Sequence, residues 1–144
     1  MACPACGETY WANSVPAIEA VIEREGRVLL ARRAHDPRAG LWDLPGGFTD
    51  EGEEPLAALD REVREETGLR VERVAFLGIW IEPDYDGRSV FCVTYAAAAA
   101  AGAPTPADDV TELRWFAPEE LPPEAEFAFA HTPRALRRWR EEHA

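Results

Sequence analysis

The segment 55–67 constrains the fold of this chain more than any other stretch, because it predicts a helix with one buried side. Pro55 suits the first turn of a helix, and Gly68 stands where helices commonly end in a left-handed residue. Apolar side chains in the segment recur at spacings of three and four residues and so share a stripe that can pack on a sheet. They are Leu56, Leu59 and Val63.

The same helix carries three glutamates, Glu62, Glu65 and Glu66, at i, i+3 and i+4. Residues at these spacings are neighbours on one helix face, and like charges there destabilise the helix. A hard divalent cation such as Mg²⁺ would offset the repulsion, because it prefers carboxylate oxygens. Taken alone, the helix favours an ordinary solvated face, since Arg61 and Glu65 form an i, i+4 pair.

The composition fits one domain spanning residues 1–144. With 144 residues and 47% hydrophobic content, the chain can bury one sizeable core but is too short for two ordinary domains. No apolar run approaches the roughly 20 residues of a membrane-spanning helix, and the N-terminus does not resemble a secretory signal, so a cytoplasmic location is expected. The formal charge of -12 repels nucleic acid at long range and favours a small, metal-chelated anion as partner.

The three cysteines do not predict a disulfide framework, so a reducing compartment fits. Cys92 lies in an apolar run, whereas Cys3 and Cys6 have the spacing of one zinc knuckle within the segment 1–9. A closed structural zinc site needs four ligands, and no second Cys-x-x-Cys follows. We therefore expect this partial knuckle to bind no zinc. A site completed by a histidine or by another subunit is the alternative.

Alternating strand and helix patterns predict the architecture. Two β-prone runs, 15–22 and 27–31, are separated by a polar turn that ends in Gly26 and predict a hairpin. A second helix is expected from Thr132, which would cap it. Further strands are expected at 41–44, 74–81, 90–97 and 113–116. Together these elements predict an α/β fold in which a mixed β-sheet is sandwiched between α-helices.

A longer pattern surrounds the glutamates and changes their interpretation. Nine residues in the 23-residue window 47–69 occupy the fixed positions of one motif: Gly47, Glu53, Arg61, Glu62, Val63, Glu65, Glu66, Gly68 and Leu69. Each residue type makes up roughly 5 to 10% of an average protein, so chance agreement is negligible. The motif resembles the Nudix box, and the segments 40–47 and 114–122 are similar to the same MutT-like family. The cysteine segment resembles the remnant of a zinc ribbon found in some members.

The resemblance implies a Nudix fold and a hydrolase that breaks the diphosphate linkage of a nucleoside diphosphate joined to another group. In this family a loop-helix-loop holds Mg²⁺ or Mn²⁺, which neutralises phosphate charge and lowers the pKa of a water aligned for attack. The resemblance assigns metal binding to Glu62, Glu65 and Glu66. It also assigns a metal contact to the carbonyl of Gly46, where the absence of a side chain makes close approach easy.

The resemblance also assigns catalytic roles beside the metal. Arg61 would orient the carboxylates by ion pairing, and Glu53 would hold the loop or take part in proton transfer. The general base stays open, because family members use either a glutamate of the box or an acid from a later loop. The candidates here are Glu65, Glu53, Asp109 and Glu112.

The substrate is less constrained than the chemistry. We expect a nucleotide base to stack on an aromatic side chain. The candidates are Trp42, Trp80, Tyr85 and Phe91, of which Trp42 and Tyr85 are chosen as the substrate-binding residues. Pro83 stands near where ADP-ribose hydrolases of the family carry a proline, and the signature of NADH pyrophosphatases is absent after Leu69. An ADP-ribose-like substrate is therefore expected, with NADH or an oxidised nucleoside triphosphate as alternatives.

A nucleotide-sensing module without catalysis is the alternative from another functional class. Such a module would be expected to have lost one of the three box glutamates, and all three are present. The sequence therefore favours an enzyme acting on a small-molecule nucleotide, with no nucleic acid or membrane partner. It leaves open whether the protein is a homodimer.

Overall fold

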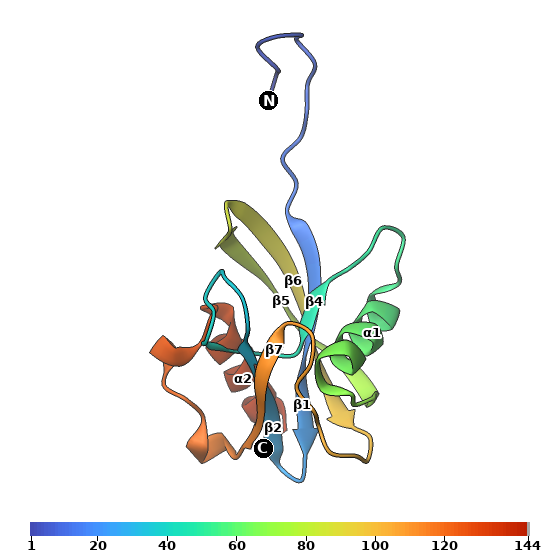
Figure 1. The fold of residues 1–144 in the computed structure, drawn as a ribbon, viewed down its shortest axis with the longest axis vertical. Coiled ribbons are helices and arrows are strands. Elements are labelled where there is room, and N and C mark those ends of the chain that lie inside the picture. The colour runs from blue at the N-terminus through green and yellow to red at the C-terminus, as the bar shows by residue number, and fades with distance from the viewer. Residues whose placement is uncertain (144) are drawn as a thin grey trace.

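The computed structural model describes residues 1–143 and contains a seven-stranded mixed sheet with an α-helix on each side (Figure 1). The strands are β1 (Val15–Arg24), β2 (Arg27–Arg33), β3 (Trp42–Asp43), β4 (Gly46–Phe48), β5 (Val71–Tyr85), β6 (Arg88–Ala99) and β7 (Val110–Phe116). The helices are α1 (Pro55–Thr67) and α2 (His131–Glu142), with short 3-10 turns at Pro118–Glu120 and Glu124–Glu126. The predicted mixed sheet between helices is confirmed.

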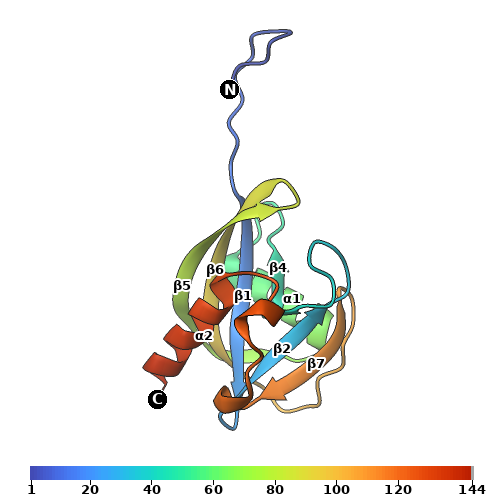
Figure 2. The same ribbon diagram turned by 90° about the vertical axis from the view of Figure 1, so that its left-hand side faces the viewer.

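Strand β1 organises the sheet, whose main path runs β3-β2-β1-β6-β5. Its longest ladder is parallel to β6 and runs from the Val15–Val90 pair to the Glu23–Ala98 pair. It also pairs antiparallel with β4 along its first half and with β2 only at its last residues. The antiparallel neighbour of β1 therefore changes from β4 to β2 along its length, and these two strands diverge from β1 at different points (Figure 2).

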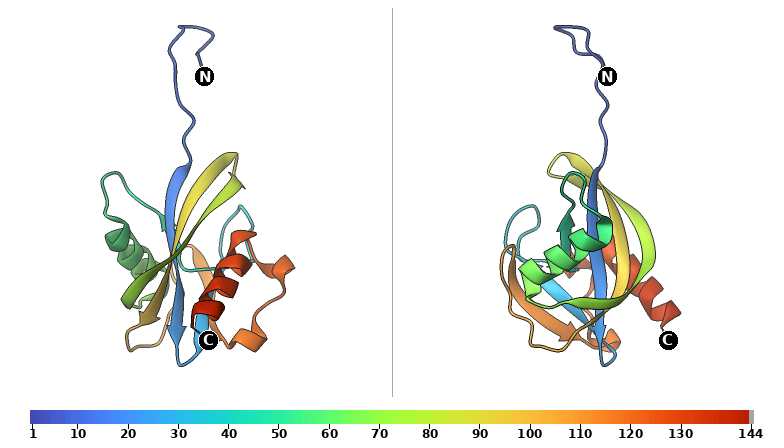
Figure 3. Two further views of the ribbon diagram at one scale, coloured as in Figure 1. Left: turned by 180° about the vertical axis from the view of Figure 1, so that it is seen from behind. Right: turned by 90° about the vertical axis from the view of Figure 1, so that its right-hand side faces the viewer.

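The alternation of side chains along β1 divides the core into two layers, since successive residues point to opposite faces of a sheet. Ile18, Ala20 and Ile22 belong to the apolar cluster that includes α1. Val21 belongs to the cluster on the other side, which includes Leu136 of α2. Figure 3 shows α1 lying across its face of the sheet. One strand therefore anchors both helices.

Helix α1 has the predicted bounds and ends at Gly68, whose φ of 73° lies in the left-handed region. Leu59 and Val63 are fully buried, as the apolar stripe predicts. Leu56, however, is 55% exposed, so its assignment to the buried stripe is wrong. It lies in the first turn of the helix, outside the apolar cluster, and Ala58 contributes to the core instead.

Other sequence predictions need correction at element boundaries. Helix α2 begins at His131 rather than after a Thr132 cap, and Thr132 is buried with its hydroxyl unpartnered among residues 1–143. The predicted strand 41–44 is shorter, and a further strand that was not predicted, β4, follows it at Gly46–Phe48. Strand β5 extends beyond the predicted 74–81 at both ends, because β6 pairs with it along most of its length.

The N-terminal segment extends away from the body of the molecule (Figure 1) and is closed by a bridge between Ala2 and Thr9. Cys3 and Cys6 are free thiols there, and Cys92 is a buried free thiol in β6. The expected absence of zinc at Cys3 and Cys6 stays a prediction. Among residues 1–143, no helix is long and apolar enough to cross a membrane.

The burial of the apolar stripe of α1 predicts how substitutions there change the free energy of unfolding. Leu59→Ala should lower the free energy of unfolding by about 2–5 kcal/mol, because it leaves a cavity at a fully buried side chain. Leu56→Ala is the matched control on the same helix and should change it by no more than about 0.5 kcal/mol. Urea denaturation followed by circular dichroism measures both values. Similar losses in the two variants would contradict this packing.

Candidate active site

A pocket of about 460 Å³ opens where α1 and the first half of β1 meet the end of β5 and the start of α2. Glu62 and Glu66 of α1 line it together with Gly46 and Gly47 of β4. Its remaining walls come from strands and loops far apart in sequence, including the loop that leads into β7. The size lies within the range of pockets that hold nucleotide-sized ligands. The glutamate helix therefore borders a cavity and does not simply face solvent.

The two glycines of β4 allow the carboxylates to approach the strand. A Cβ atom on Gly47 would lie 2.5 Å from the carboxyl carbon of Glu62, so any side chain there would displace the carboxylate. The backbone N–H of Gly46 donates a hydrogen bond of 3.0 Å to Oε2 of Glu66. Gly46 itself is packed against the backbone of Ile18 and Glu19. These contacts fix both carboxylates at one end of the pocket.

Burial dominates the electrostatics of these carboxylates. It raises the pKa of Glu66 to about 9, with further contributions from the neighbouring charges of Asp43 and Glu62, although the Gly46 N–H opposes the shift. Burial also raises the pKa of Glu62, against the lowering effect of Arg61. A cation bound between these groups would favour their ionised forms. Two converging carboxylates beside glycine backbone provide the hard oxygen donors that suit Mg²⁺ or Mn²⁺.

Arg61 connects the acids of the box. Its guanidinium donates to both oxygens of Glu53 at 2.8 and 2.9 Å and to Glu62 at 2.8 Å. It also reaches Glu65 at 3.3 Å and the carbonyl oxygen of Phe48 at 3.2 Å. The hydrogen bonds from Arg61 lower the pKa of Glu53 to about 2. Glu53 is thus held as a carboxylate that ties the loop before α1 to the helix.

Glu65 lies apart from the other two glutamates. Its side chain is 46% exposed and borders a shallow surface hollow with Arg61 and Arg64, outside the main pocket. Glu62 and Glu66 are four residues apart and point to the pocket, whereas Glu65 is rotated toward solvent. The three predicted metal ligands therefore divide into a pair within the pocket and one residue at its outer edge.

The two general-base candidates from the later loop and strand, Asp109 and Glu112, also differ in whether they line the pocket. Asp109 lines the pocket, and its carboxylate lies 3.6 Å from Nε2 of His35. Glu112 does not line the pocket and accepts hydrogen bonds from Arg32 and Arg114, each at 2.9 Å. The bond from Arg114 is the largest cause that lowers the pKa of Glu112. Of the two later-loop candidates, only Asp109 faces the space next to the box glutamates.

The two aromatic candidates for base stacking, Tyr85 and Trp42, also differ in whether they line the pocket. Tyr85 lines the pocket, where its ring stacks on Phe129 with centroids 5.7 Å apart. Trp42 is 2% exposed and packs edge-on against Phe116 in the core, so it offers no ring face to the pocket. The assignment of Trp42 to substrate binding needs correction, because its strand turns the indole into the α2 side of the core.

Sequence patterns did not single out several polar residues in and beside the pocket. They form three acid–base pairs: Glu19 with His131 at 3.0 Å, Asp43 with Arg33 at 3.3 Å, and Glu82 with Arg38 at 3.6 Å. Burial, followed by the charge of Glu19, raises the pKa of Asp43 to about 6. A charged residue inside an otherwise apolar strand, as at Glu19, was the available signal, because such residues are rarely buried without a partner.

Comparison with known proteins agrees with this geometry. A family model described as NUDIX domain matches residues 13–142. The chain belongs to the Nudix family. It is a hydrolase acting on nucleoside diphosphate derivatives, and Nudix hydrolases generally use divalent metal ions.

Three similar proteins illustrate the range of this Nudix hydrolase's relatives. An ADP-ribose pyrophosphatase of Methanocaldococcus jannaschii is 34% identical over 116 residues, covering 80% of this chain and 67% of the relative. The NAD-capped RNA hydrolase NudC of Vibrio parahaemolyticus is 31% identical, and the match covers 87% of this chain but 47% of that protein. The crystal structure of a MutT Nudix hydrolase from Burkholderia pseudomallei has a TM-score of 0.76 and 33% identity, covering 88% of this chain and 98% of that one.

The buried state of Glu66 predicts how metal-free protein responds to pH. The folded-state pKa is raised from 4.5 to about 9, so between these values the folded chain binds more protons than the unfolded chain. The free energy of unfolding should therefore fall as the pH rises through this window. Glu66→Gln removes the ionisable group and should flatten the fall, with a gain on the order of a few kcal/mol near neutral pH.

Urea denaturation in the presence of EDTA, at several pH values inside this window, tests the prediction. Glu65→Gln is the control, because it removes a half-exposed carboxylate from the same turn of α1. An equal gain in both variants would show that general charge repulsion, and not burial of Glu66, is responsible.

Proposed function

We propose that this Nudix hydrolase cleaves the diphosphate of an ADP-ribose-like nucleotide with the help of Mg²⁺ or Mn²⁺. The observation that carries the proposal is the single pocket that has Glu62 and Glu66 at one end and the Tyr85–Phe129 stack among its other walls. A diphosphate between a nucleoside and a second sugar needs these two environments side by side. The identity with an ADP-ribose pyrophosphatase supports this substrate class. Three free thiols suit the reducing cytoplasm.

At the diphosphate end, Glu62 and Glu66 would hold the metal, with the backbone of Gly46 as a further donor. A bound divalent cation supplies charge neutralisation of the phosphate oxygens and lowers the pKa of water. Arg61 keeps Glu62 oriented through its 2.8 Å ion pair and so acts as a positioning residue. Glu65, at the outer edge, is the weaker candidate for direct metal contact.

Asp109 is the general base that this geometry favours. Glu53 is engaged by Arg61 and has a pKa near 2, and Glu112 is engaged by two arginines, so neither is suited to accept a proton. Glu65 does not line the pocket. Asp109 does, and it is not paired with an arginine in the described structure. Asp109 would take the proton from the water that attacks phosphorus.

Two further carboxylates, Asp43 and the buried Glu82, line the pocket together with the aromatic stack. When ionised, they only accept hydrogen bonds, so they suit the amino group of a base such as adenine. Arg33 donates to the Tyr85 hydroxyl at 2.9 Å and holds that ring against Phe129. An exposed face of this stack would add roughly 1 to 3 kcal/mol of base binding.

The metal-site assignment predicts a graded loss of activity. Glu62→Gln and Glu66→Gln should each lower kcat by at least about 100-fold in excess Mg²⁺, because each removes a charged oxygen donor from the pocket. Glu65→Gln should retain more activity than either, since Glu65 lies at the outer edge. Steady-state hydrolysis of ADP-ribose measures all three. Near-normal turnover by Glu66→Gln would refute the assignment.

The general-base assignment is tested by a matched pair of variants, Asp109→Asn and Glu112→Gln. Asp109→Asn should lower kcat by about 100-fold or more with little change in KM, because proton transfer typically contributes a factor of this order. Glu112→Gln, three residues away and outside the pocket, should keep most of the activity. The reverse order in the two variants would assign the base to Glu112.

A substrate panel tests the substrate class. At one fixed Mg²⁺ concentration, kcat/KM should be highest for ADP-ribose, with AMP and ribose 5-phosphate as products, and lower for NADH, diadenosine polyphosphates and 8-oxo-dGTP. Longer polyphosphates bring more charge toward a chain whose formal charge is -12. A preference of about tenfold or more, about 1.4 kcal/mol, for NADH or 8-oxo-dGTP would overturn the substrate class and leave the hydrolase assignment intact.

A further inference from the structure

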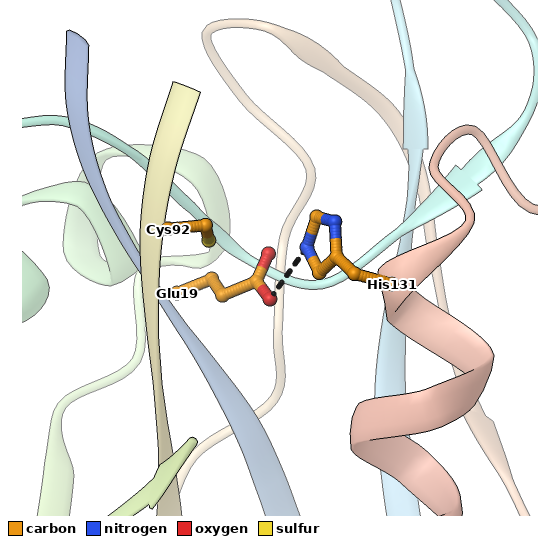
Figure 4. Close-up of side chains that lie close together, drawn as sticks. All are labelled: Glu19, Cys92 and His131. Atoms are coloured by element: carbon orange, nitrogen blue, oxygen red, sulfur yellow. Dashed lines mark hydrogen bonds and ion pairs between the residues drawn. The ribbon is translucent and has the colours of Figure 1, made fainter. Parts of the chain in front are cut away.

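Three potential metal ligands of different chemistry meet inside the same pocket, and none of them is a box glutamate. They are Glu19 of β1, Cys92 of β6 and His131 at the start of α2, and Figure 4 shows the Glu19 carboxylate between the other two side chains. One ligand atom from each lies within 4.8 Å of the others. The three residues are 6%, 3% and 5% exposed. Such a convergence of carboxylate, thiol and imidazole has no role in the phosphate chemistry proposed above.

The geometry points to a zinc site formed by Glu19, Cys92 and His131. Zinc in proteins is bound by Cys sulfur, His nitrogen and carboxylate oxygen, usually in tetrahedral geometry, and the spacing of these three groups permits that arrangement after small side-chain shifts. Mg²⁺ requires oxygen donors and would stay with the box glutamates. The two groups of ligands in the pocket thus differ in metal preference, because α1 supplies hard oxygen donors and the cluster supplies a mixed set.

Two further observations support a ligand at this cluster. Nδ1 of His131 is buried and has no hydrogen-bond partner among residues 1–143, and an unsatisfied buried polar atom in a native protein calls for an explanation such as a bound ion. The Glu19 carboxylate is also held from behind, because the Thr94 hydroxyl donates to its Oε1 at 2.7 Å and the Trp80 indole donates to Thr94 at 3.1 Å. Such outer hydrogen bonds orient metal ligands.

The charges balance when zinc binds. Burial raises the pKa of the Cys92 thiol, with Glu19 and Asp43 adding to the shift, so the thiol keeps its proton in the metal-free protein. Nε2 of His131 and Oε1 of Glu19 are 3.0 Å apart and share a hydrogen bond. Zinc would displace the thiol proton into solvent and leave a thiolate, a carboxylate and a neutral imidazole as ligands. The two negative charges of the thiolate and the carboxylate would then match the two positive charges of zinc.

The site would keep a fourth position open toward the pocket, because all three residues line it. The ring of His131 also stacks on Phe129, with centroids 5.9 Å apart, next to the Tyr85–Phe129 stack. Zinc would therefore occupy space that the nucleotide needs and would inhibit hydrolysis from a position other than the Mg²⁺ site. The inhibitory effect rests on the proposed function, whereas zinc binding itself does not.

The binding test uses a full-length parent with Cys3→Ser and Cys6→Ser, so that Cys92 is its single thiol. Cobalt(II) is added as a spectroscopic probe for zinc, with excess Mg²⁺ to occupy the box glutamates. The expected result is one equivalent bound per chain with a thiolate-to-cobalt charge-transfer band, which zinc then displaces. Adding Cys92→Ser to the parent should abolish the band and weaken zinc binding by more than about tenfold, since even outer-shell changes cost that much.

A second measurement keeps the test decisive if Cys92→Ser is poorly folded. Cys92→Ala places a small apolar side chain at this buried position, and circular dichroism confirms its fold before use. Zinc should raise the melting temperature of the parent, since it binds the folded chain, and should not raise that of Cys92→Ala. An equal thermal shift in the Cys92 variants, or undiminished cobalt binding by metal analysis, would overturn the site, as would a parent that binds no cobalt.

A parallel titration of Glu62→Gln separates the cluster from the box glutamates. Unchanged cobalt absorption in this variant supports the cluster, whereas loss of cobalt binding there and not in Cys92→Ser places the cation at the box. In the parent, zinc should also inhibit ADP-ribose hydrolysis competitively in excess Mg²⁺. Binding without inhibition would confirm the zinc site and count against the proposed position of the nucleotide, so the two proposals fail separately.

Discussion

Helix α1 must supply the core and the chemistry from the same few turns. Leu59 and Val63 are fully buried against β1, and this packing fixes the rotation of the helix about its axis. Because side chains follow each other at about 100° around a helix, the rotation brings Glu62 and Glu66 to the edge of the buried seam. Glu66 becomes 7% exposed as a result. The apolar stripe thus determines where the carboxylates lie. Because burial disfavours the charged form of Glu66, it raises the pKa of that carboxyl.

Arg61 offsets part of the cost of burying Glu62, because it lowers the pKa of that carboxyl against the effect of burial. Its guanidinium donates hydrogen bonds to three carboxylates and a backbone carbonyl, so it joins the loop before α1 to the helix and to β4. Glu53 and Glu65 are held on its outer side, while Glu62 is held at the pocket. The network is partly exposed, so its value lies more in orienting side chains than in net stability.

Strand β1 places two kinds of polar site in one cavity. Ile18 points into the α1 layer, and its neighbour Glu19 points the other way, where the start of α2 brings His131 within 3.0 Å. The parallel ladder with β6 sets Thr94 opposite Glu19 and leaves Cys92 one side-chain repeat away on the same face. The pocket therefore spans both faces of the fold, with oxygen donors contributed by α1 and a mixed donor set contributed by the strands and α2.

The sequence by itself determined the glutamate helix, its ends at Pro55 and Gly68, the Nudix box and a mixed sheet between helices. These features depend on local periodicity and on spacings within one segment, which can be read from the sequence without knowledge of tertiary contacts. Tertiary structure decided which glutamates face the pocket, because helical spacing fixes their relative angles and only packing fixes the direction of the set. It likewise turned Trp42 into the core and brought Asp109 to the pocket while Glu112 remained outside. Glu19 and His131 are 112 residues apart and meet only through strand pairing and the docking of α2, and no local pattern encodes that contact.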